Sequence, residues 1–337
     1  MQNIKISYVT TLPLIGNAPS VTVTGGVDTY MVNFLDGDKL VSQQWVKPGE
    51  TVYAGHQWYT NWIIEIYKNG VLKHIDTFNP RDKVIFIKMD GYALGDNLAW
   101  FPYFVQFKKI HNCQLICSTF FNQLFKDEYP DILFVEPNTI IHNIYAQYYV
   151  GGGKNENPHY TNTSTFDRPL QKVAADLLGL KYEEIKPKIT INKEKKNIIG
   201  DYVCLSEWCS GKDKMWNGDW QQVVNFYLSK GLNVVVISKE PTQLKGVINK
   251  TGDIPLEDRI SDLYHSKYFI GISSGLAWLA WSVGTHVVMI SDYTPVFHEF
   301  QSGITRLNFA KKERIDNQPF PHISTEDVIK QLNLLIY

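Results

Sequence analysis

The chain has 337 residues, which is long enough for two or three domains rather than one. Its composition is 44% hydrophobic and 20% charged, with a formal net charge of −1, and this excludes the basic surface typical of nucleic-acid-binding proteins. No apolar run is long enough to span a membrane, and the N-terminal residues do not resemble a signal peptide, so we expect a cytoplasmic protein.

Four cysteines occur in two pairs, Cys113/Cys117 and Cys204/Cys209. Neither pair has C-x-x-C spacing, and no cluster of histidines accompanies either pair, so we do not expect a zinc site. Cys113 and Cys117 lie in an apolar run, which predicts buried thiols in a reducing compartment.

Residues 1–80 are predicted to form a small all-β domain, either a sandwich or a barrel. Asn69-Gly70 lies between two apolar runs and predicts a tight hairpin. We expect this domain to act as a scaffold or as a contact between copies in a homo-oligomer, with acceptor binding as the alternative. Its clearest predicted strands cover residues 21–24, 30–34, 41–45 and 62–67.

From residue 81 onward strands alternate with helices, which predicts doubly wound parallel sheets. A first α/β domain is assigned to residues 81–187, and residues 184–189 suit a linker at its end. A helix is predicted from Leu98, and the polar residues 151–165 are predicted to form a long surface loop. The predicted strands are 84–88, 114–117 and 132–135, and the other predicted helices are 121–125 and 168–178.

A second α/β domain is predicted over residues 188–310, followed by a C-terminal tail and helix over residues 311–337. The two α/β domains would face each other across a cleft, which suits an enzyme that holds a nucleotide in one of them. The predicted strands are 202–205, 233–237, 268–272 and 286–290, and the predicted helices are 220–229, 256–266 and 325–335.

The turn Ser273-Ser274-Gly275 follows an apolar strand and precedes a helix that is expected to start near Leu276. Such a turn directs backbone N–H groups and a helix N-terminus at one point, which favours an anion. A packed βαβ unit without a ligand is the alternative. The chain has no G-x-G-x-x-G after a strand and no P-loop motif, and Asp36-Gly-Asp38 is better explained as a turn. A metal-free diphosphate site would then depend on this turn with Lys212 and Lys214.

Three segments together resemble the family 9 glycosyltransferases, the bacterial heptosyltransferases: residues 95–102 (GDNLAWFP), 214–216 (KMW) and 274–281 (SGLAWLAW). Within that family they are most similar to the autotransporter O-heptosyltransferases, over about residues 80–305. The resemblance implies a GT-B fold behind an N-terminal β domain, an ADP-activated heptose donor, inversion at the anomeric carbon and no catalytic metal ion.

The same resemblance implies that Asp96 is the general base. This role is chemically reasonable, because a Ser or Thr hydroxyl that attacks an anomeric carbon must lose its proton as the new bond forms. The alternative is that Asp96 only caps the helix predicted from Leu98.

The remaining candidates divide between the two ends of the donor. Lys214 would neutralise the diphosphate, and the turn at Ser274, Gly275 and Leu276 would hold the phosphates through its N–H groups. A solvated loop lysine is the alternative for Lys214. Trp278 and Trp281 are interpreted as helix packing. Among the other donor-side candidates, Ile254 and Leu256 would flank the adenine and Glu240 would hold the ribose; the rest are Trp216 and Ser273. The acceptor or sugar side would include Gly95, Asn97, Thr294 and Glu299.

Two departures from the family pattern limit what it implies. Ser273 stands where lipopolysaccharide heptosyltransferases have an aspartate, and no cysteine follows Cys209, whereas the autotransporter enzymes carry a later cysteine cluster that binds iron. We therefore expect no iron and no other cofactor. The predicted function is transfer of a heptose or related sugar from a nucleotide diphosphate to a protein or glycan hydroxyl. A non-catalytic GT-B carbohydrate- or protein-binding component and a sugar-nucleotide epimerase are the alternatives.

Overall fold

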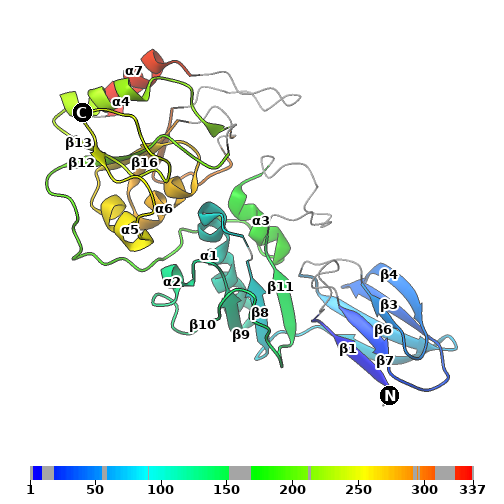
Figure 1. Ribbon diagram of the computed structural model, residues 1–337. Coiled ribbons are helices and arrows are strands. Elements are labelled where there is room, and N and C mark those ends of the chain that lie inside the picture. Colours follow the sequence, from blue (N-terminus) through cyan, green and yellow to red (C-terminus); the bar gives the residue numbers. More distant parts are fainter. Residues whose placement is uncertain are drawn as a thin grey trace. The chain divides into compact units, whose positions relative to one another are not determined.

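A computed structural model describes most of the chain and divides it by contacts into two compact units (Figure 1). The first unit consists of residues 1–92, 103–162 and 172–183, and the second of residues 93–102, 163–171 and 184–337. The described residues are 3–9, 19–54, 59–89, 91–151, 168–211, 214–290, 294, 297–307 and 323–335.

Two antiparallel sheets build the N-terminal part of the first unit, with strand orders β1-β2-β5 and β4-β3-β6-β7. Asn69 and Gly70 join β6 to β7 with φ values of 51° and 75°, which confirms the predicted hairpin. Phe34 and Ile66 point inward and are fully buried. The strands are β1 (Ile4–Ser7), β2 (Ser20–Val23), β3 (Tyr30–Asp36), β4 (Lys39–Val46), β5 (Thr51–Tyr53), β6 (Trp62–Lys68) and β7 (Val71–Thr77).

One row of side chains across the four-stranded antiparallel sheet contains Trp45, Met31, Tyr67 and Leu72. Trp45 and Leu72 are 61% and 42% exposed. The predicted homo-oligomer contact of the N-terminal β domain would cover both side chains if it used this face. The contact itself stays a prediction.

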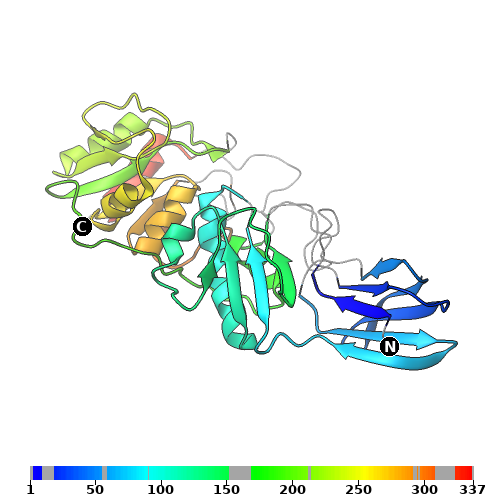
Figure 2. The same cartoon turned by 60° about the horizontal axis from the view of Figure 1, so that its bottom comes forward.

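The first unit also contains a parallel sheet with strand order β10-β9-β8-β11, in which every pair is parallel (Figure 2). Its central strand β8 carries three successive buried residues, Ile85, Phe86 and Ile87, as expected for a strand that is covered on both faces. The strands are β8 (Val84–Lys88), β9 (Gln114–Ser118), β10 (Leu133–Phe134) and β11 (Ala146–Tyr149), and the helices of this region are α1 (Leu94–His111), α2 (Asn122–Phe125) and α3 (Leu170–Leu177).

The second unit is organised around a six-stranded parallel sheet with strand order β14-β13-β12-β15-β16-β17. In Figure 1, α4 and α7 lie on one side of these strands and α5 and α6 on the other, which confirms the predicted doubly wound arrangement. The strands are β12 (Tyr202–Ser206), β13 (Asn233–Val236), β14 (Ile248–Asn249), β15 (Tyr268–Gly271), β16 (His286–Met289) and β17 (Ile304–Arg306), and the helices are α4 (Trp220–Ser229), α5 (Leu256–Tyr264), α6 (Gly275–Val283) and α7 (Thr325–Leu335).

Helix α1 differs from its prediction, because it begins at Leu94 rather than Leu98. Its first turns, up to Pro102, belong to the second unit, and the rest of the helix belongs to the first. The loop predicted over residues 151–165 lies outside the described residues after Gly151. Within the part of the chain that the structure describes, no helix is long and apolar enough to cross a membrane.

Candidate functional site

The strand order of the second unit places two loops side by side. From β12 the chain moves outward to β13 and β14, and then returns to the other side of β12 at β15. The point between β12 and β15 is therefore the topological switch point, where open α/β sheets bind ligands beyond the carboxyl ends of their strands. Lys214 follows β12, and Ser273 to Gly275 follow β15. Residues far apart in the sequence thus meet at one edge of the sheet.

Ser274 is the N-cap of α6. It has extended backbone angles, and its Oγ accepts a hydrogen bond from the backbone N–H of Ala277 at 3.4 Å. The helix therefore starts at Gly275, one residue earlier than predicted, and its first N–H groups point beyond the sheet edge. A helix N-terminus carries a partial positive charge that favours a phosphate.

The N-terminus of α1 packs directly against the N-terminus of α6. A Cβ added to Gly275 would lie 3.0 Å from Leu94 Cβ and 3.2 Å from the backbone N of Gly95. A Cβ added to Gly95 would lie 3.1 Å from Trp278 Cδ1 and 3.5 Å from Gly275 Cα. Only glycine fits at both positions without displacement of its neighbours, so the two helix N-termini are brought together by the absence of two side chains.

Asp96 lies in the first turn of α1, next to this contact. Because α1 begins at Leu94, Asp96 lies inside the helix, and the alternative that it is the N-cap of a helix starting near Leu98 is wrong. Burial raises the pKa of Asp96 to about 6, and the positive charge of Lys214 opposes this shift. A carboxyl group with this pKa is mostly ionised at neutral pH and can accept a proton.

Lys214 is half-buried in the loop after β12, and its backbone N–H donates to the carbonyl of Gly211 at 2.9 Å. The positive charge of Lys214 lowers the pKa of Asp96, so the two side chains interact electrostatically. We call Lys214, the Ser273–Gly275 turn, Gly95 and Asp96 the switch-point site. Lys212, the second predicted lysine, lies outside the described residues.

Glu299 and Arg306 form an ion pair at the β16–β17 end of the same sheet edge. Glu299 is 2% exposed, and one carboxylate oxygen lies 2.8 Å from Arg306 Nη1. Burial alone would raise the pKa of Glu299, but His298, Arg306 and the Ser273 hydroxyl together hold it below its ordinary value. The structure thus brings two predicted residues, Ser273 and Glu299, close together. Arg306 was not predicted, because an arginine at the end of a short strand carries no distinctive sequence signal.

Two further candidates are structural neighbours of the site. Trp216 is 3% exposed, packs edge-to-face on Trp220 and donates its indole N–H to the carbonyl of Ile323 at 2.9 Å. These are the contacts of a core residue and do not support the predicted donor contact. Asn97 is 1% exposed, and its amide donates to the carbonyl of Ala93 in the same helix turn at 2.9 Å.

The tryptophans of α6 are packing residues, as the sequence predicts. Trp278 and Trp281 are 3% and 1% exposed, and the ring of Trp281 stacks on Phe300 with centroids 4.6 Å apart. Both side chains fix the helix whose N-terminus builds the site.

The remaining candidates lie on either side of the switch point. Glu240 is exposed and follows β13, while Ile254 is half-buried and follows β14. Thr294 is fully buried and lies between β16 and β17 in the chain. The fold therefore separates the predicted nucleoside contacts from the predicted sugar contacts along one sheet edge.

The four cysteines do not fit an iron site. All are buried, free thiols, and burial raises the pKa of each. Cys204 donates to the carbonyl of Asp262 and Cys209 to that of Gly211, at 3.4 and 3.1 Å. Metal ligation requires thiolates. Over the described ranges, no group of three or more His, Cys, Asp or Glu side chains is placed to share a metal ion.

No family model matches the chain. The autotransporter heptosyltransferase Aah of Escherichia coli is 31% identical to it over 272 residues, which cover 74% of this chain and 68% of Aah. The inactive autotransporter heptosyltransferase BimC of Burkholderia thailandensis is 29% identical over 266 residues, covering 74% of this chain and 62% of BimC. The matched region thus spans about two thirds of the length of these relatives.

Two crystal structures of TibC, one of them described as from enterotoxigenic E. coli H10407, match nearly the whole chain. One, described as an iron-containing dodecameric glycosyltransferase, has a TM-score of 0.81 at 25% identity and covers 95% of this chain and 87% of TibC. The other, in complex with ADP-D-beta-D-heptose, has a TM-score of 0.84 at 23% identity and covers 98% of this chain and 95% of that chain.

The parallel sheets, the N-terminal antiparallel sheets and these structural matches define a GT-B fold of the heptosyltransferase type. Because Aah is 31% identical and is covered over 68% of its length, the chain belongs to the autotransporter heptosyltransferase family.

Replacement of Gly275 by alanine tests the contact between the two helix N-termini. Alanine favours a helix by about 1 kcal/mol over glycine, but its Cβ would crowd Leu94 and Gly95 at 3.0–3.2 Å. We expect crowding to dominate, with a net loss of about 1–3 kcal/mol in the free energy of unfolding. Gly91→Ala is the control, because a Cβ there meets nothing within 4 Å. Equal stability of the two variants in urea unfolding would contradict the proposed contact.

Asp96→Asn tests the burial of the carboxyl group by the pH dependence of stability. The folded pKa of about 6 lies above the ordinary aspartate value of 3.8, so the native state binds more protons between these values and loses stability as the pH rises. Asparagine does not ionise and avoids this loss. The variant should exceed the wild type by about 1–3 kcal/mol at pH 8 and by little at pH 4. If the wild type were as stable as Asp96→Asn at pH 8, the burial of a charged carboxylate at this position would be refuted.

Proposed function

We propose that the chain is an inverting, metal-independent glycosyltransferase that moves a heptose or related sugar from a nucleotide diphosphate to a hydroxyl group. The observation that carries the proposal is the switch-point site, where an acidic group with a raised pKa lies beside a lysine and a helix N-terminus within one compact unit. A base and an anion site in one place would serve the two ends of a sugar-nucleotide displacement.

In the proposed reaction, an acceptor hydroxyl attacks the anomeric carbon, and the carboxylate of Asp96 takes its proton as the bond forms. The bond from the anomeric carbon to the diphosphate oxygen breaks on the opposite face, so the configuration inverts. The departing diphosphate gains negative charge, which Lys214 and the N–H groups at the start of α6 would stabilise. Gly275 would let the backbone approach the phosphates closely.

ADP-heptose is the donor that we propose to test first. The support is the TibC structure with ADP-D-beta-D-heptose, together with membership of the family. The nucleoside would lie toward Glu240 and Ile254, and the sugar toward Thr294 and Glu299. The buried ion pair of Glu299 with Arg306 suggests that Glu299 shapes the sugar side rather than offering a free carboxylate.

We propose a protein Ser or Thr hydroxyl or a glycan hydroxyl as the acceptor, since the relatives are autotransporter heptosyltransferases by name. TibC is described as dodecameric, and for this chain a homo-oligomer through the N-terminal β domain remains the proposal. We propose that no iron is bound, because the four buried thiols do not form a ligand set.

A second candidate is a non-catalytic binding component, which the relative BimC favours because it is described as inactive. The two candidates separate on donor hydrolysis, since a competent site should release ADP slowly from ADP-heptose even without an acceptor. An epimerase would need an acid–base pair in the site. His298 and Glu299 are adjacent in the chain, but both are buried and Glu299 is paired with Arg306.

Asp96→Asn should lower kcat/KM for transfer by about 10²–10⁴-fold, because the amide cannot accept the proton. ADP affinity, measured by calorimetry, should change little. In the wild type, kcat/KM should fall as the pH drops below about 6, where the carboxyl group becomes protonated. Full transfer by the variant would show that Asp96 is not the base.

Lys214→Ala should weaken ADP binding by roughly tenfold or more, because a charge-assisted contact to the diphosphate is lost. It should also move the acidic limb of the pH–rate profile to higher pH, since Lys214 lowers the pKa of Asp96. Lys245→Ala, at an exposed lysine of the same unit, is the control. Unchanged ADP affinity in the Lys214 variant would contradict the phosphate role.

A further inference from the structure

Arg259 is a buried arginine whose guanidinium is devoted to backbone carbonyls. It lies on α5 and is 6% exposed. Nη1 donates to the carbonyls of Ile237 and Lys250, the latter at 3.1 Å, and Nη2 donates to those of Gly252 at 2.7 Å and Ser238 at 3.5 Å. One side chain thus holds the chain immediately after β13 and immediately after β14.

The two loops are also tied to each other beside Arg259. The N–H of Gly252 donates to the carbonyls of Ser238 and Lys239 at 3.2 and 3.0 Å, and its φ of +94° suits glycine. One helical turn beyond Arg259, the fully buried Asp262 pairs with Lys250 at 2.7 Å. The loops are therefore fixed from α5 by two charged side chains, of which Arg259 reaches both loops.

The loops that Arg259 joins carry the candidate nucleoside contacts. Glu240 is two residues beyond Ser238, and Ile254 is two residues beyond Gly252. At the proposed nucleoside site, the spacing between these loops would set the width available to a base and its ribose. The planar fork of arginine can bind four carbonyls in fixed directions, whereas the single ammonium of lysine cannot reproduce that arrangement.

We infer that Arg259 is a positioning residue for the nucleoside half of the donor: it fixes the loops after β13 and β14 relative to each other and thereby sets the affinity for the nucleoside. This inference rests on the proposed function. It assigns Arg259 no contact with the donor and no part in the chemistry, and it leaves the diphosphate to the switch-point site.

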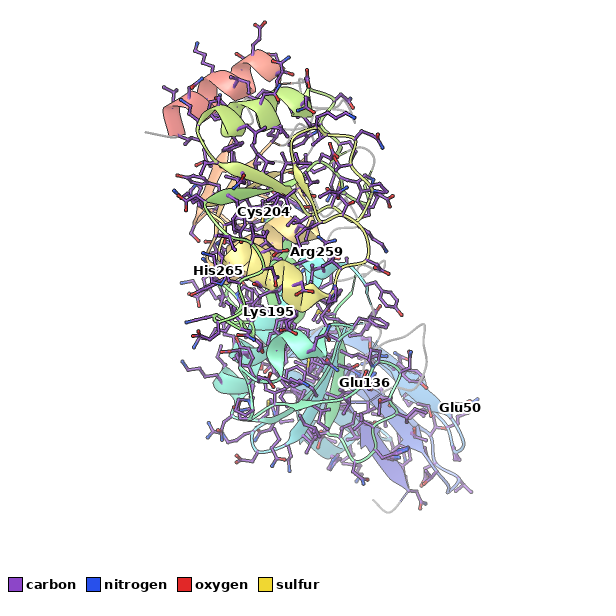
Figure 3. The ribbon with its side chains drawn as sticks, turned by 60° about the vertical axis from the view of Figure 1, so that its left-hand side comes forward. Glu50, Glu136, Lys195, Cys204, Arg259 and His265 are labelled. Carbon is purple, nitrogen blue, oxygen red and sulfur yellow. The ribbon has the colours of Figure 1, made fainter. Side chains whose placement is uncertain are left out.

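α5 itself offers a matched control. Figure 3 labels Arg259 and Lys195 on opposite sides of this helix. On the Lys195 side, Ser261 is 2% exposed, and its hydroxyl donates to the Lys195 carbonyl. Ser261→Ala removes a buried hydrogen bond from the same helix without touching either loop, so it reports the effect of general destabilisation.

The test compares Arg259→Lys, Arg259→Met and Ser261→Ala with the wild type by calorimetry, using ADP and inorganic pyrophosphate as separate ligands. Both Arg259 variants should bind ADP about tenfold more weakly and pyrophosphate within about twofold of the wild type. Ser261→Ala should bind both ligands normally even if its melting temperature falls. With ADP-heptose, the Arg259 variants should show a raised donor KM with kcat nearly unchanged.

Three outcomes would overturn the inference without refuting the proposed function. Folded Arg259 variants with wild-type ADP affinity would show that the loops hold their spacing without this side chain. Equal losses for ADP and pyrophosphate would show a general rather than a local defect. A Lys variant that binds ADP normally beside a defective Met variant would show that charge alone matters. A wild type that binds neither ligand would instead refute the proposed function, and the inference with it.

Discussion

The second unit depends on one close contact, in which the N-termini of α1 and α6 meet at Gly95 and Gly275. Two helix dipoles with their positive ends together would ordinarily repel each other. The carboxyl group of Asp96 lies in this region of partial positive charge, and the same region would favour a diphosphate. Burial raises the pKa of that carboxyl group while Lys214 restrains it, so the proposed base and the proposed anion site are subject to the same local charges.

Much of the fold was predictable because its strongest signals are local. The Asn69-Gly70 hairpin, the apolar run of β8 and the small-residue turn after β15 were each recognised from a few neighbouring residues. Strands β14 and β17 were not predicted, because their two and three residues are too few to show a strand pattern and each pairs on one side only, at an edge of the sheet. The boundaries of the predicted domains stay predictions.

Tertiary contacts explain where the site differs from what the sequence predicts. Glycine weakens a helix, yet Gly95 lies in the first turn of α1, because the packing against Gly275 leaves no room for a side chain there. Trp216 looked like a ligand contact and is a core residue. The role of Arg259 had no sequence signal, because any residue can provide a backbone carbonyl acceptor. Arg306 pairs with the carboxylate of Glu299, and nothing in the sequence around either residue indicates that pairing.

The second unit is built from three separate segments of the chain, and this affects how it can fold during synthesis. Residues 93–102 leave the ribosome about 180 residues before Gly275, the partner against which they pack. At typical translation rates this interval is roughly 10–40 s. During that time the first turns of α1 lack Gly275, the residue against which they pack in the folded unit. The site therefore cannot assemble in order from the N-terminus, and its completion depends on the last third of the protein.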